Sequence, residues 1–279
     1  MTQATGHRLD HLPPAASRLG AVFARPKALA AICVIALAGL GWFALALQAA
    51  NSGVIAALCR ALMSEPVSAA TVTLVAGMWA AMTLAMMLPS AAPMILTYAE
   101  IADTAAAKNE PVVSPFVIAA GYTAVWFGFA IAATFAQLAL TRAALLDANL
   151  AAASGLFSGA IFIGAGVYQF SALKHACLTQ CRNPFQFFFT RWATTPRGVF
   201  KLGLRQGLFC LGCCWAMMLV MFAVGVMNVI WMAALGVVMT LEKIGSGKRF
   251  TYAVGVGLIA IGLAFIATSV AAHWPGRAV

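Results

Sequence analysis

The chain consists of long apolar stretches separated by short clusters of charged and turn-forming residues. A helix of about 20 apolar residues spans the hydrocarbon core of a bilayer. The pattern therefore predicts an all-α integral membrane protein with about seven transmembrane helices, six being the alternative count. We expect the spans near residues 28–49, 69–97, 115–141, 150–173, 206–226, 228–242 and 250–272. The sixth is short for a full crossing, and a tilted or partly re-entrant segment is expected there.

The apolar region defines the predicted domain organisation. Residues 28–273 are expected to form one transmembrane helical domain. Residues 1–27, with two prolines and scattered polar groups, are expected to be a mobile cytoplasmic tail, and residues 274–279 a short C-terminal tail. The first apolar stretch exceeds the usual signal-peptide core of about 7–15 residues, so we interpret it as an uncleaved anchor.

Composition and charge narrow the class of protein further. Hydrophobic residues make up 63% of the chain and charged residues 9%, which excludes a soluble globular protein. The net charge of +10 reflects sidedness, because 14 of the 17 Lys and Arg residues fall on one side of the predicted spans. The three exceptions are Arg60, Arg142 and Arg277. This bias predicts a cytoplasmic N-terminus in a multi-pass protein of the inner (cytoplasmic) membrane of a prokaryote, in contact with lipid and not with nucleic acid.

Two segments depart from simple apolar spans. Residues 174–205 form the longest predicted loop and combine six basic residues with the aromatic stretch 185–192. Such a segment is typical of an amphipathic helix in the headgroup layer, and a docking surface for a partner is the alternative. Pro89 and Pro93 lie inside the second span and are expected to kink it.

Cysteine is concentrated in one part of the chain. Five of the seven cysteines lie within 38 residues, at the cytoplasmic ends of the fourth and fifth predicted spans. Because the loop between these spans begins and ends on the same side of the membrane, the two groups can meet. They are Cys177 and Cys181, followed by Cys210, Cys213 and Cys214. Cys33 and Cys59 have no evident partner and are interpreted as bystanders.

Helical spacing extends the second cysteine group into a stripe of sulfur. The stripe occupies one face of a helix and runs roughly 16 Å from the cytoplasmic interface. Its members are Cys210, Cys213, Cys214, Met217, Met218 and Met221, and its continuation reaches Asn228. A second row, entering from the outer side, is formed by Met78, Met82 and Met86.

Thiolate and thioether ligands with little histidine favour a soft cation, and Cu(I) above all. The sequence thus predicts a metal-delivery protein rather than an enzyme, which passes copper to a partner cuproenzyme or metallochaperone, or across the membrane. Packing of methionines in an apolar core is the alternative for the stripe. For the cysteines the alternatives are a structural zinc site with four thiolates and a thiol-disulfide relay. His175 either joins the site or is an interfacial histidine.

Other chemistries find little support. The segment 245–248 lacks the leading glycine and the Ser or Thr of a phosphate-binding loop, and the four histidines offer no triad. Gly155 and Gly159 are interpreted as helix-packing positions, with a contact between copies of the chain as the alternative. Glu242 and Lys243 are interpreted as a solvated interfacial ion pair, with a proton-coupled role for Glu242 as the alternative.

Four blocks of sequence resemble the DUF2182 family. They are residues 78–94 (MWAAMTLAMMLPSAAPM), 121–126 (GYTAVW), 168–184 (YQFSALKHACLTQCRNP) and 207–243, with its GLFCLGCCWAMM segment. The resemblance covers roughly residues 70–245. It implies a metal-binding integral membrane protein and, in some members, a copper chaperone for a cuproenzyme such as a tyrosinase. The positions it implies for metal binding are Cys177, Cys181, Cys210, Cys213 and Cys214, supported by Met82, Met86, Met87, Met217 and Met218.

Overall fold

The computed structural model describes residues 26–50, 68–147, 150–226, 228–245 and 247–273. These ranges are helical, with one isolated bridge between Leu146 and Ala152 and no strand. Most of the predicted N-terminal tail, Cys59 and the predicted C-terminal tail lie outside them. The helices are α2 (Pro26–Ala50), α4 (Ala69–Ala107), α5 (Pro115–Arg142), α6 (Gly155–Tyr168), α7 (Ala172–Arg182), α8 (Pro184–Phe189), α9 (Pro196–Val224), α10 (Val229–Ile244) and α11 (Lys248–His273).

Five of the described helices are long and apolar enough to cross a membrane, namely α2, α4, α5, α9 and α11. A sixth crossing results if α6 and α7, which meet at a bend of 64°, count as one broken span. Residues 150–173, predicted as one span, comprise α6 and the start of α7 and are broken by this bend. The expected span at 228–242 corresponds to α10, which has 16 residues and is about 24 Å long, shorter than the hydrocarbon core of about 30 Å. The predicted count of seven is thus reduced to five or six.

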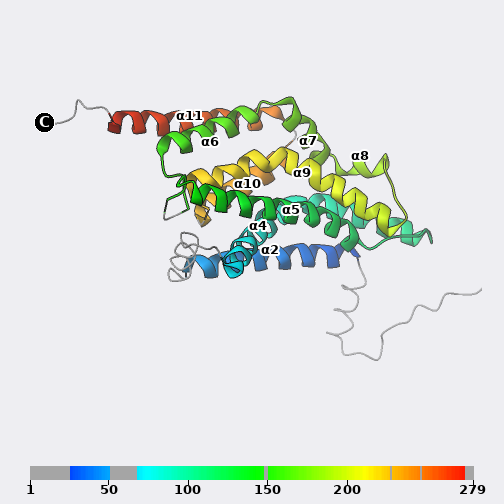
Figure 1. Cartoon of the computed structure of the whole chain (residues 1–279). Coiled ribbons are helices and arrows are strands. Elements are labelled where there is room, and N and C mark those ends of the chain that lie inside the picture. The colour runs from blue at the N-terminus through cyan, green and yellow to red at the C-terminus, as the bar shows by residue number, and fades with distance from the viewer. Residues whose placement is uncertain (1–25, 51–67, 148–149, 227, 246, 274–279) are drawn as a thin grey trace, which may run out of the picture.

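Helix α9 lies in the middle of the bundle (Figure 1). It packs against α5, α6, α7 and α10, while α4 lies between α2 and α5. The pair α6 and α11 forms one edge of the bundle, and α2 forms the opposite edge. A residue on α9 is therefore surrounded by side chains from several helices, which makes this helix suited to carry a buried site.

Glycine permits the closest helix contact in the bundle. A Cβ atom on Gly121 of α5 would collide with the carbonyl oxygen of Phe200, and one on Gly203 of α9 would collide with that of Ile118. These two glycines let the backbones of α5 and α9 touch. Gly159 of α6 makes a similar contact with α11 inside the chain, which confirms the packing interpretation of this glycine.

Helix α4 continues through both of its prolines. Pro89 cannot donate to the carbonyl of Ala85, and the indole Nε1 of Trp42 on α2 donates to that oxygen instead, at 3.0 Å. The hydroxyl of Tyr122 on α5 donates to the carbonyl of Met87 at 3.1 Å. A polar side chain of a neighbouring helix therefore satisfies the carbonyl that Pro89 leaves free, as the interior of a membrane protein requires.

The segment predicted as one loop, residues 174–205, is largely helical and comprises most of α7, α8 and the first turns of α9. Its aromatic residues do not all face outward. Phe188 is fully buried, and its ring and that of Trp192 each lie 5.5 Å from the ring of Tyr98 on α4. Phe185 and Phe189 remain exposed. The segment therefore comprises several helices and not one, and part of its aromatic stretch packs on the C-terminal part of α4.

Candidate metal centre

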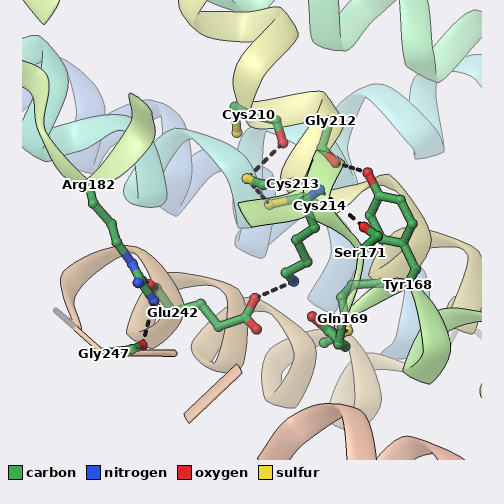
Figure 2. Close-up of polar contacts among 12 residues, drawn as sticks. Tyr168, Gln169, Ser171, Arg182, Cys210, Gly212, Cys213, Cys214, Glu242 and Gly247 are labelled. Carbon is green, nitrogen blue, oxygen red and sulfur yellow. Dashed lines mark hydrogen bonds and ion pairs between the residues drawn. The ribbon is translucent and has the colours of Figure 1, made fainter. Parts of the chain in front are cut away.

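Three cysteines of α9 form a compact, buried group (Figure 2). The Sγ atoms of Cys210, Cys213 and Cys214 all lie within 4.8 Å of one another, and each residue is at most 2% exposed. The Sγ atoms of Cys213 and Cys214 are 3.3 Å apart, and the thiol of Cys213 donates to the carbonyl of Cys210 at 3.2 Å. The spacing i, i+3, i+4 along one helix brings these sulfurs together without help from another element.

Cys210 is also in contact with two polar side chains from other helices. The ammonium of Lys243, at the end of α10, lies 3.0 Å from Cys210 Sγ and donates to Ser90 Oγ of α4 at 2.6 Å. The hydroxyl of Tyr122 lies 2.9 Å from the same sulfur. Lys243 is buried, and among the described residues it has no carboxylate partner. The described partners of this ammonium are therefore the sulfur of Cys210 and the hydroxyl of Ser90.

Glu242, the neighbour of Lys243 in sequence, belongs to a separate ion pair. Its Oε2 atom lies 2.8 Å from Nζ of Lys174 on α7, with both side chains almost fully buried. Arg182 donates from Nε to the carbonyl of Glu242 at 2.8 Å and from Nη2 to that of Gly247 at 3.2 Å (Figure 2). The prediction of a solvated Glu242–Lys243 pair is wrong, since consecutive residues of a helix point in directions about 100° apart.

The two cysteines of α7 occupy different positions relative to α9. Cys181 lines the same pocket as Cys210, although its sulfur does not join the group within 4.8 Å. Cys177 packs against Gly212, where a Cβ would collide with its sulfur. Gly212 lies on another face of α9 than the three grouped cysteines. The structure thus brings Cys181 to the centre and leaves Cys177 beside it.

His175 faces away from the three grouped cysteines. Its ring lies 5.3 Å from that of Tyr252 on α11, edge to face. It is not part of the group of candidate ligands formed by the three cysteines of α9. Its Nε2 atom is buried without a hydrogen-bond partner, and both predicted roles of this histidine stay predictions.

The predicted methionine rows are buried in the same apolar core as the cysteines. None of the six is more than 2% exposed, and they are Met78, Met82 and Met86 on α4 and Met217, Met218 and Met221 on α9. The sulfur of Met217 accepts a hydrogen bond from Nε2 of Gln169 at 2.9 Å. Asn228, the expected end of the stripe, caps α10 by accepting from the backbone N–H of Trp231. Its polarity is therefore explained by helix capping.

Sequence reasoning missed the polar residues around Cys210. Lys243 was interpreted as a partner of its neighbour, while Ser90 stands between the two prolines, where only the kink was considered. Tyr122 lies in the GYTAVW block of the resemblance, which was the one available signal for it. A buried lysine in the last turn of an apolar helix is unusual enough to be a signal as well.

Three converging sulfurs suit a soft ion of low coordination number. With a metal–sulfur distance of about 2.3 Å, three sulfurs in a plane around one ion lie about 4 Å apart. The separations in the group, of which one is 3.3 Å and none exceeds 4.8 Å, bracket that value. A structural zinc site needs four ligands, and within the described residues the compact group ends at three.

The comparisons with known proteins agree with this chemistry. A family model described as "PpoB2: Copper chaperone" matches residues 76–265, which include all three grouped cysteines and Lys243. No curated protein and no solved structure was found to match the chain.

Proposed function

The chain belongs to the PpoB2 copper chaperone family, and on this premise we propose that it carries Cu(I) within the membrane and passes it to a partner cuproenzyme or across the bilayer. The observation that carries the proposal is the buried group of Cys210, Cys213 and Cys214. Thiolates of this group capture the ion. In this proposal, the end of the bundle that carries these cysteines and the basic segment 174–205 faces the cytoplasm of a prokaryotic cell.

The neighbouring ammonium supports a monovalent ion. Two thiolates and one Cu(I) ion carry a net charge of −1, and the charge of Lys243 at 3.0 Å from Cys210 balances it. A balanced set of charges avoids the large cost of an unpaired charge in an apolar interior. If the third cysteine stays protonated, like the Cys213 thiol that donates to the carbonyl of Cys210, two thiolates with a divalent ion are already neutral and leave the ammonium without a counter-charge.

The methionines of α9 supply a route away from the cysteines. Met217 and Met218 lie one helical turn beyond Cys213 and Cys214, and Met221 lies one turn further. Their thioethers are neutral, so the ion moves along them without the cost of a cluster of thiolates in lipid. Further thioether ligands are available on α4, where the row of Met78, Met82 and Met86 is buried in the same core.

Metal analysis of the purified protein tests the cysteine centre. Wild type is expected to hold about one copper per chain, and the triple variant Cys210→Ser, Cys213→Ser, Cys214→Ser almost none. Cys33→Ser is the matched control, because this cysteine lies on the outer helix α2. Zinc in place of copper, lost also in Cys181→Ser, would indicate a structural four-thiolate site. An absence of both metals together with exchanging disulfides would indicate a redox relay.

A second variant separates transfer from capture. Replacing Met217, Met218 and Met221 together by leucine conserves volume and should cost little stability. The variant is expected to retain copper at the cysteines but to lose most of its ability to activate a copper-dependent partner enzyme. Met239→Leu, equally buried but on α10, serves as control. Undiminished activation in the triple variant would show that the methionines only fill the core.

A further inference from the structure

A pocket of about 260 Å³ lies against the cysteine centre at the basic end of the bundle. It is bounded by side chains of α4, α5, α7, α9 and α10. Two cysteines contribute to its wall, Cys210 and Cys181. Because Cys210 is only 2% exposed, a molecule that exchanges copper with this sulfur reaches it through the pocket.

The charges of the pocket suit an anion. Lys243 and Arg182 both line it, and its described lining contains no carboxylate. The carboxylate nearest in sequence, that of Glu242, is paired with Lys174. The hydroxyls of Ser90 and Tyr122 add further polar groups to the wall. A carboxylate of a bound ligand would find donors here.

Gln206 provides an unpartnered acceptor. It lies one helical turn before Cys210 on α9, lines the same pocket and is 2% exposed. Its Nε2 atom donates weakly to the carbonyl of Gln180 at 3.4 Å, but its Oε1 atom has no hydrogen-bond partner. Buried polar atoms are nearly always paired, so an orphan acceptor in a pocket points to a ligand with an N–H donor.

We propose that this pocket binds a small peptide thiol that bears carboxylates and carries Cu(I), the chemical class of glutathione. Its thiolate approaches Cys210, its amide N–H donates to Gln206 Oε1, and its carboxylate faces the guanidinium of Arg182. Copper passes by ligand exchange: each Cu–S bond to a donor thiolate breaks as one to a protein sulfur forms, and the proton released by the protein thiol goes to the departing thiolate. No electron is transferred. The inference rests on the proposed copper function.

The recessed position of the sulfurs favours a small donor over a protein. Cys213 and Cys214 are each 1% exposed, and Cys210 lines a pocket with a volume of only about 260 Å³. A tripeptide fits such a recess, whereas a folded copper carrier would contact the rim. A protein donor is therefore one of the outcomes that the experiment distinguishes.

The first measurement is the rate at which purified full-length protein takes Cu(I) from its glutathione complex. Gln206→Met is expected to slow this loading about 5- to 10-fold, the effect of losing one buried hydrogen bond, without changing the copper held at equilibrium. Gln186→Met, on the exposed side of α8, receives the same substitution outside the pocket and should load at the wild-type rate. Equal rates for the two variants would overturn the proposal.

The second measurement uses wild-type protein and S-methylglutathione, which cannot bind copper through a thiolate. It is expected to bind the copper-free protein and to compete with loading from the Cu(I)–glutathione complex. Binding with no copper retained at the cysteines would refute the proposed function but keep the pocket. Normal copper loading without any binding or competition would refute the pocket and keep the function. Loading only from a protein-bound Cu(I) source would likewise overturn the small-thiol inference.

Discussion

The buried ion pair between Lys174 and Glu242 offers the sharpest test of the structure. It joins α7, which carries Cys181, to α10, which carries Lys243. At a separation of 2.8 Å and an effective dielectric constant of about 20, the two charges attract each other by about 6 kcal/mol. Glu242→Gln removes one charge and leaves Lys174 buried without a counter-ion. Local relaxation and water penetration offset part of this attraction, and a loss of about 3–5 kcal/mol in the free energy of unfolding is expected.

A double-mutant cycle measures this coupling. The cycle comprises the single variants Lys174→Met and Glu242→Leu and their combination, which removes both charges and is expected to return close to the stability of the wild type. The free energy of unfolding of detergent-solubilised protein provides the readout, with copper retention recorded in parallel. A fall of less than about 1 kcal/mol in Glu242→Gln, or additive effects of the two positions, would show that the side chains are hydrated and not paired as described.

Two further substitutions test the packing of the bundle. Gly121→Ala is expected to lower stability by about 1–3 kcal/mol because the new Cβ meets the backbone of α9, whereas Gly128→Ala, on the same helix with open space around it, should be neutral or stabilising. Thermal unfolding of the two variants measures this difference, and a similar loss of stability in both would contradict the close contact between α5 and α9. Trp42→Phe is expected to cost about 1–2 kcal/mol, since it removes the donor for the carbonyl that Pro89 leaves free. In a Pro89→Ala background, which restores a backbone N–H, the same change should cost measurably less.

The sequence predicted the helices and the chemistry of α9 well. The length of the apolar stretches predicted the positions of most of the membrane helices. The helical period predicted that the three cysteines lie together on one face of a helix. Prediction was poorer where a helix breaks. Hydropathy treats residues 150–173 as continuous, but Ser171 caps a new helix by accepting from the N–H of Lys174, and the chain turns by 64°. The hydropathy of a stretch depends on its composition and therefore does not indicate where a helix bends.

The same limit applies to the residues around the cysteines. Cys177 and Cys181 looked equivalent from their spacing, yet Cys181 lines the pocket with Cys210 while Cys177 packs against Gly212, because position along a helix fixes direction only within that helix. Lys243, Ser90 and Tyr122 reach the centre from α10, α4 and α5, whose crossing no local pattern specifies.

The sequence alone therefore determined that the protein is helical, apolar and rich in soft ligands on one face of one helix. Only the tertiary structure decided which charges and hydroxyls surround those ligands and where a pocket reaches them. The physical reason is that helical periodicity is a local property of the backbone, whereas the pairing of a buried ammonium with a sulfur depends on how separate helices pack.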